Sequence, residues 1–216
     1  MKKKNLRPFV DIIMTLLLLM SMSYELIGSV FEKFFGIDAY EYGALIHEYV
    51  GTAFILVVFF HLWLNRKWLM NIFNGKYNPA RAVLVISDLV LIADIILILI
   101  SGIMMSRVLS LDFSDESLGM SFARTAHMLA SYWGYVIMSF HVGLHVKKFP
   151  AILFIPALYG IYAFFKRQIH EYMFLITEFA FFDFDEPLIF FFIDYICVMI
   201  LFAFAGFFIM KACRKC

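Results

Sequence analysis

Long apolar runs alternate with short charged segments along the whole chain. A helix needs about 20 mostly apolar residues to cross the roughly 30 Å hydrocarbon core of a bilayer. The first four runs reach or approach that length, so the pattern predicts an all-α, polytopic transmembrane helical bundle. We expect residues 1–216 to form a single integral membrane domain. The apolar runs cover roughly residues 9–31, 45–64, 82–105, 125–146, 150–165 and 187–210.

The composition supports a membrane protein. The chain is 63% hydrophobic and 16% charged, whereas a soluble domain is about half apolar and a quarter charged. The net charge of +1 gives no strongly basic face, so we expect the lipid bilayer and not nucleic acid as a partner. The run that follows Met1–Lys4 is too long for a signal peptide and lacks a small-x-small cleavage site, so it is interpreted as an uncleaved first span. Cys213 and Cys216 form a lone C-x2-C, which is interpreted as part of a solvated tail, with metal binding or acylation as alternatives.

Lysine and arginine predict the orientation of the spans, because cytoplasmic loops carry an excess of both. Basic residues precede the first run, separate the second from the third and follow the fourth. The loops after the first and third runs instead contain more acidic than basic residues. We therefore expect a cytoplasmic N-terminus and a multi-pass chain whose second and fourth spans run in the same direction. The basic residues are Lys2, Lys3, Lys4, Arg7, Arg66, Lys67, Lys76, Arg81, Lys147 and Lys148.

The C-terminal part leaves two topologies open. Residues 150–165 supply a sixth crossing, or they form an interfacial or re-entrant segment and leave five crossings. A sixth crossing places Lys166 and Arg167 on the outer side, against the charge rule. Residues 168–185 are then predicted to form an amphipathic helix on the outer surface. The region of about 150–210 is thus expected to combine an interfacial segment with a last span.

Four histidines in the second and fourth runs share one spacing. His47 and His61 are 14 residues apart, and so are His127 and His141. In a helix this step gives about 21 Å of rise and a net rotation of about 40°. An ionisable side chain inside a span is a functional-site hypothesis by default, and two axial imidazoles can hold haem iron. Because the two spans run in the same direction, we expect His47 to pair with His127 near the outer face and His61 with His141 near the inner face.

These pairs predict a four-helix haem-binding core over about 9–146, with two b-type haems, or one if only one pair is occupied. His145 leaves the inner ligand open, because it lies four residues after His141 on the same helix face. The matched 14-residue step favours His141. His145, about one turn deeper, would then contact a propionate, and the alternative is that it is the ligand itself.

Two other functions use the same histidines. A membrane metal-binding or metal-transport protein could bind zinc, copper or iron through them, with His141 and His145 sharing one ion. That alternative does not explain why His47 and His61 are so far apart. A structural subunit without a cofactor would use the histidines only for hydrogen bonds between helices.

Other residues near the histidines fit a bulky planar cofactor. Gly51 and Gly134 allow a close approach of backbone and cofactor, or they simply let helices pack closely. Arg124 lies one turn before His127 and can pair with a propionate. Of the carboxylates in apolar runs, Asp94 is the deepest, and it is a candidate for carrying protons in quinol oxidation or for staying protonated.

Three segments carry a resemblance to a known family. They are GALIHEYVGTAFILVVFFHLWLNRKWL (43–69), SGIMMSR (101–107) and RTAHMLASYWGYVIMSFHVGLHVKK (124–148). In these segments the chain resembles the flavinylation-associated cytochrome family of bacterial membrane proteins. Residues 159–187 are also similar to the C-terminal region of some members, so the resemblance covers most of the chain.

The resemblance implies a b-type cytochrome in the bacterial cytoplasmic membrane, with ligands at His47, His61, His127 and either His141 or His145. It implies electron transfer from menaquinol, another quinol or another membrane donor to an extracytoplasmic protein that carries covalently attached flavin. The chain contains no evident flavin attachment site or soluble redox domain, so that acceptor is expected to be another polypeptide. We therefore expect an electron-transfer subunit of an oxidoreductase system rather than a complete enzyme.

Overall fold

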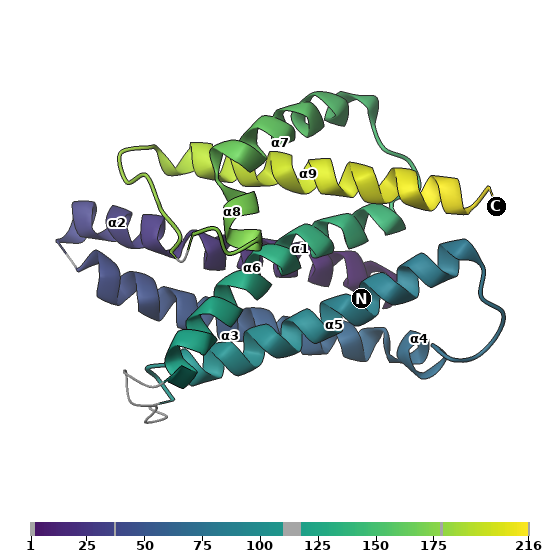
Figure 1. Ribbon diagram of the computed structural model, residues 1–216, viewed down its shortest axis with the longest axis horizontal. Coiled ribbons are helices and arrows are strands. Elements are labelled where there is room, and N and C mark those ends of the chain that lie inside the picture. The colour runs from purple at the N-terminus through teal and green to yellow at the C-terminus, as the bar shows by residue number, and fades with distance from the viewer. Residues whose placement is uncertain (1–2, 37, 110–117, 178, 216) are drawn as a thin grey trace. The chain divides into compact units, whose positions relative to one another are not determined.

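The computed structural model describes residues 3–36, 38–109, 118–177 and 179–215. These residues contain helices and no strand, which confirms the all-α class. The order along the chain (Figure 1) is α1 (Lys3–Met22), α2 (Tyr24–Phe35), α3 (Ala39–Leu64), α4 (Arg66–Met70), α5 (Pro79–Met105), α6 (Leu118–His145), the 3-10 turn η1 (Ala151–Leu153), α7 (Phe154–Lys166), α8 (Ile169–Met173) and α9 (Leu188–Cys213).

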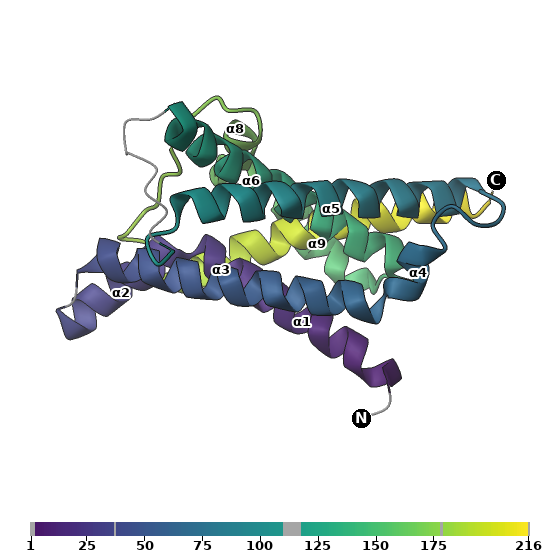
Figure 2. The same ribbon diagram turned by 90° about the horizontal axis from the view of Figure 1, so that it is seen from below.

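The chain divides into two compact units. Unit 1 comprises Met1–Gly75 with Phe182–Phe191, and unit 2 comprises Lys76–Phe181 with Phe192–Cys216. Within unit 1, α1 and α2 pack along α3, as Figure 2 shows for α1. Within unit 2, α5 packs along α6. Each unit therefore places one of the predicted histidine-bearing helices, α3 or α6, beside the apolar helix that precedes it.

Several helices support a membrane-embedded chain. Among the described residues, three segments are both long and apolar enough to cross a bilayer: Glu41–Leu64 within α3, α5 and α9. Leu6–Met22 and Tyr24–Phe35 satisfy the same test only as a pair, with a 68° bend between them. The expected first span over 9–31 is therefore broken rather than continuous. The helix α7 is apolar but shorter than a full span.

The α6 helix is 28 residues long but is not among the helices apolar enough to pass this test. The helix predicted over the fourth apolar run, residues 125–146, is thus confirmed. That this helix crosses the membrane stays a prediction. Part of the surface of α6 is buried: Ala123, Ala130 and Tyr135 are each at most 2% exposed. A helix that is covered by its neighbours can hold polar side chains without presenting them to lipid.

Local sequence explains where the main helices begin and end. The Asp38 side chain accepts a hydrogen bond from the backbone N–H of Glu41 at the start of α3. Asn78 does the same for Arg81 at the start of α5, where Pro79 occupies the first turn. Such side-chain caps satisfy N–H groups that have no partner within the helix.

The predicted amphipathic helix over 168–185 is wrong for most of its length. Of the residues that the structure describes in this stretch, Ile169–Met173 alone is helical, and the next helix is α9. Gln168 and Leu175 both adopt positive φ, at 52° and 53°. Left-handed backbone at a residue other than glycine interrupts a right-handed helix, so these two positions bracket the short α8.

Candidate functional site

In unit 1, the His47 ring on α3 is held by the end of α1. Its Nδ1 lies 2.9 Å from the backbone oxygen of Ser21 and 3.2 Å from the Ser21 Oγ. Ser21 lies in the last turn of α1, where carbonyl groups have no partner within the helix. A carbonyl only accepts, so Nδ1 carries the proton in this bond. The neutral ring then has its lone pair on Nε2.

The break between α1 and α2 thus has a local cause. The chain leaves the helix at Ser23, whose φ and ψ are −101° and 15°. Ser23 is fully buried, and its hydroxyl donates to the carbonyl of Met20. A side chain that bonds to backbone groups at such a point is a known cause of sharp helix bends. Here the imidazole of His47 is that side chain, and it bonds to the backbone carbonyl of Ser21.

The second unit 1 histidine contacts a carboxylate. His61 Nδ1 lies 2.8 Å from Oδ1 of Asp11 on α1. The Asn65 amide nitrogen lies 3.2 Å from His61 Nε2. Because a carboxylate accepts and an amide NH₂ donates, both contacts place the proton on Nδ1 and the lone pair on Nε2.

In unit 2, the His127 ring contacts a serine on α5. His127 Nδ1 lies 3.0 Å from Ser101 Oγ, and that hydroxyl also lies 2.7 Å from the carbonyl oxygen of Leu97. A hydroxyl has a single hydrogen, and the Leu97 carbonyl can only accept it. Ser101 Oγ therefore accepts a hydrogen bond from the His127 Nδ1–H, which again leaves the lone pair of the ring on Nε2.

The second unit 2 histidine again contacts a carboxylate. His141 Nδ1 lies 2.9 Å from Oδ1 of Asp88 on α5. The Nδ1–H does not point along this line, so the contact is an ion-pair contact and not an aligned hydrogen bond. The side chains of His141 and Asp88 are 20% and 16% exposed.

Both units therefore repeat one arrangement. On the first helix an aspartate precedes a serine, and on the second helix two histidines follow 14 residues apart. The serine contacts the first histidine across a separation of 26 residues in both units. The aspartate contacts the second histidine. The sequence reasoning found the histidines but missed these partners, although the equal Ser-to-His spacing was a signal that could have found the serines.

His145 lies in the same part of unit 2. Its ring centroid is 4.7 Å from that of His141, and its side chain is exposed. One ligand atom from each of Asp88, His141 and His145 can be chosen so that all three lie within 4.8 Å of one another. The predicted ambiguity between His141 and His145 thus has a structural basis, with Asp88 as the group they share.

The predicted accessory residues have different surroundings. Gly51 in unit 1 has space beside it, because a Cβ added there would meet only the Ser21 Oγ at 3.9 Å. Gly134 in unit 2 lies against Asp94, whose Oδ2 would be 2.1 Å from an added Cβ. Arg124 is exposed, one turn before His127 on α6. The expected pairing of Arg124 with a propionate stays a prediction.

Comparisons with protein-family models, with curated proteins and with solved structures find no match to this chain. The chemistry of the site therefore rests on its own residues. Imidazoles that bind a metal usually hydrogen-bond through the other ring nitrogen to a carboxylate or a carbonyl. His47 bonds to a carbonyl and His61 to a carboxylate in this way. His127 bonds instead to the Ser101 hydroxyl, and His141 has the carboxylate contact without its alignment. These donor sets fit the axial ligands of haem, and also a divalent transition metal.

Proposed function

We propose that this protein is a membrane di-haem b-type cytochrome that relays electrons across the bilayer. In this proposal the four histidines supply the axial ligands in the pairs that their spacing predicts, His47 with His127 and His61 with His141. Quinol or another membrane donor supplies electrons, and an extracytoplasmic protein with bound flavin accepts them, as the resemblance to flavinylation-associated cytochromes implies. The chain is then an electron-transfer subunit of an oxidoreductase system.

One observation supports the proposal above the others. Two units carry the same set of residues, in which an oxygen atom on the preceding helix contacts Nδ1 of each histidine. Ordinary hydrogen bonding between helices explains one such contact but gives no reason for a matched step of about 21 Å in both units.

The residues have distinct roles in this proposal. The histidines ligate through Nε2, and at His61 the Asn65 amide must then leave that atom. Ser21, Asp11 and Ser101 accept the Nδ1–H and fix the ring orientation and the tautomer, while Asp88 lies beside His141 Nδ1. Burial and hydrogen bonding around the ligands set the potential of the bound group. Haem itself supplies one-electron exchange between its ferric and ferrous forms.

The decisive experiment is a dithionite-reduced minus oxidised spectrum of the purified protein, with haem quantified as the pyridine haemochrome per chain. We expect about two b-type haems per chain. His47→Ala and His61→Ala should each lower the content by about one haem. His170→Ala, outside the repeated arrangement, is the matched control and should keep the full content. A protein without haem, made with ample haem supply, contradicts the proposal.

A metal-binding function is the second candidate, and the cluster of Asp88, His141 and His145 favours it. Two imidazoles and a carboxylate suit zinc or another divalent transition metal. This candidate predicts bound zinc or copper in elemental analysis and no haem absorbance. Loss of the metal in His145→Ala would then distinguish this cluster from the haem sites.

A further inference from the structure

We propose that Asp11 and Asp88 lower the reduction potential of the inner haem relative to the outer one, and so favour electron flow from the inner to the outer face. This inference rests on the proposed function. It makes the two aspartates positioning residues, which act on the haem through the histidines they contact.

The two ends of each unit differ in the charge of the group that contacts Nδ1. Asp11 lies 2.8 Å from His61, and Asp88 lies 2.9 Å from His141. The first histidine of each unit instead contacts a neutral serine oxygen. The difference occurs independently in unit 1 and in unit 2, and the carboxylates lie at the same end in both.

A carboxylate that accepts the Nδ1–H hydrogen bond, as Asp11 does for His61, makes the imidazole a stronger electron donor to a metal. Asp88 is not aligned with the His141 N–H and acts through its charge alone. The negative charge of either carboxylate stabilises ferric iron, which has one more positive charge than ferrous iron. Both effects lower the reduction potential, and a neutral serine oxygen supplies neither. The basic residues Arg66, Lys67, Lys147 and Lys148 lie near the same end, but all four are exposed. Water and salt screen exposed charges, so the carboxylates in direct contact dominate.

The two aspartates should contribute unequally. The Asp88 side chain is 16% exposed, whereas that of Asp11 is 49% exposed. A charge shielded from water acts more strongly on its neighbour. In the favoured direction one electron leaves the inner site, which is oxidised, and reduces the outer site. A quinol or another membrane reductant resupplies the inner site, and the flavin of the partner protein is the terminal acceptor.

The test is a potentiometric titration of the haem absorbance in the intact protein. We expect two components, of which His61→Ala removes the lower and His47→Ala the upper. Asp88→Asn should raise the lower component clearly, Asp11→Asn should raise it less, and the upper component should stay in place. Asp88→Glu keeps the negative charge, so the lower potential should stay close to its wild-type value.

Asp185→Asn is the control, because Asp185 is an exposed carboxylate outside the repeated arrangement. Equal potentials in the wild type, or a lower component that neither aspartate variant moves, overturn the inference while the cytochrome proposal stands. A protein without haem overturns the proposed function itself. If Asp88→Asn prevents haem binding, Asp11→Asn carries the test.

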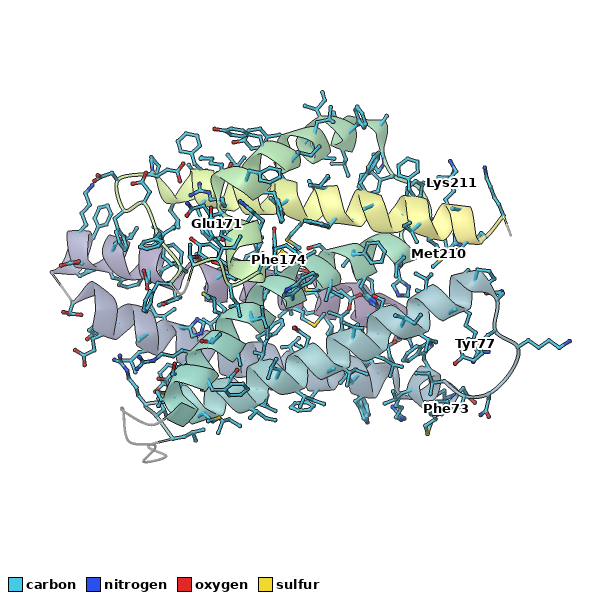
Figure 3. The ribbon with its side chains drawn as sticks, viewed as in Figure 1. Phe73, Tyr77, Glu171, Phe174, Met210 and Lys211 are labelled. Carbon is cyan, nitrogen blue, oxygen red and sulfur yellow. The ribbon has the colours of Figure 1, made fainter. Side chains whose placement is uncertain are left out.

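A second inference concerns the C-terminal ends of α6 and α9 in unit 2, which are predicted to be cytoplasmic. Basic side chains surround a hollow there. The hollow has a volume of about 570 Å³ and lies between the end of α6 and the end of α9, and none of the described residues that line it is acidic. Lys211, labelled near the end of α9 in Figure 3, lies 6.0 Å from the ring of Phe207, which forms part of the apolar lining. The basic residues around the hollow are Lys147, Lys148, Lys211, Arg214 and Lys215.

The geometry points to a binding site for an anionic phosphate group, carried by a lipid headgroup or free in solution. Basic pockets between transmembrane helices on the cytoplasmic side bind anionic headgroups. The positive-inside pattern accounts for basic residues at this end, but not for five of them around one hollow with an apolar lining. The inference does not depend on haem.

Thermal stability in neutral detergent tests it, with phosphatidylglycerol, phosphatidylcholine or inorganic phosphate added. We expect phosphatidylglycerol to stabilise the protein, and Lys211→Gln with Arg214→Gln to abolish the effect. Lys67→Gln with Lys76→Gln, which removes two exposed charges elsewhere, is the control and should keep it. Stabilisation by inorganic phosphate as well assigns the site to a free anion. Stabilisation by neither anion, or an equal loss in both double variants, overturns the inference.

Discussion

The carboxylate of Asp194 on α9 binds Arg167, which follows α7, with Arg167 Nε 2.7 Å from Asp194 Oδ2. Asp194 is only 1% exposed, and it also accepts hydrogen bonds from Tyr159 and Lys166. The six-crossing topology predicts an outer location for Lys166 and Arg167, against the charge rule. Asp194 compensates the charges of these two residues within unit 2, whichever topology holds.

Asp194→Asn should therefore destabilise the protein substantially. Loss of the carboxylate leaves Lys166 and Arg167 without their anionic partner, and breaking a buried ion pair costs about 3–5 kcal/mol. A lower thermal unfolding midpoint in detergent measures the effect. Asp185→Asn, at an exposed position, is the control and should change the midpoint little.

A combined variant separates charge from packing at this cluster. Asp194→Leu with Lys166→Met and Arg167→Met should recover much of the lost stability, because apolar side chains can replace a buried ion cluster at little cost. If Asp194→Asn is as stable as the wild type, no loss remains for the triple variant to recover, and the cluster contributes no net stability.

A second prediction concerns the close packing of α6 on α9. A Cβ added at Gly143 would lie 1.9 Å from the carbonyl oxygen of Ala203, and one added at Gly206 would lie 2.1 Å from that of Phe140. Backbone atoms cannot yield as side chains do, so even alanine must push the helices apart. Gly143→Ala and Gly206→Ala should each cost about 1–3 kcal/mol.

Thermal unfolding in detergent again measures this cost. Val142→Ala is the control, because Val142 is adjacent in sequence but 43% exposed. If Gly143→Ala matches Val142→Ala in its effect, the close approach of the two helices does not matter for stability.

The sequence predicted the helical class and the histidines because both are repeated local patterns. Apolar runs of about 20 residues identify spans without any knowledge of the fold, and the step from His47 to His61 defines one helix face. The Nδ1 partners are tertiary contacts. The partner of His47 includes a backbone carbonyl of Ser21 that becomes available only because α1 ends there, which no residue type reveals.

The incorrect helix over 168–185 has a similar origin. Its apolar and acidic residues fit an amphipathic pattern, but Leu175 adopts left-handed backbone. The chain after Leu175 is instead stabilised by a hydrogen bond between residues nine positions apart, in which the Phe181 backbone N–H donates to the Tyr172 hydroxyl. Such contacts override helical periodicity where the amphipathic signal is short.

A third prediction distinguishes the roles of Gly51 and Gly134, which lie on the same helices as His47 and His127. Gly51→Ala should leave the thermal stability unchanged, since the nearest atom to an added Cβ is 3.9 Å away. It should nevertheless lower the haem content if the open space beside Gly51 is where the cofactor lies. Full haem occupancy in Gly51→Ala would remove Gly51 from the cofactor surface.

Gly134→Ala should behave differently, because its added Cβ would collide with the Asp94 carboxylate. We expect a loss of stability that Asp94→Ala relieves in the double variant. Haem content measured in the double variant then tests Gly134 alone. If the double variant regains both its stability and its haem content, Gly134 serves helix packing. If the haem content stays low, Gly134 contacts the cofactor.

The last prediction decides between His141 and His145. His141 contacts Asp88 within unit 2 and is 20% exposed, whereas His145 is exposed and one turn further along α6. A ligand held by a neighbouring carboxylate and shielded from water fits an axial position better than an exposed one. His141→Ala should therefore lose about one haem per chain, and His145→Ala should keep both. Pyridine haemochrome quantification measures the content, and low-temperature spectra of the reduced protein identify which component disappears. The reverse result, with haem lost only in His145→Ala, would make His145 the inner ligand and limit Asp88 to a structural contact with His141.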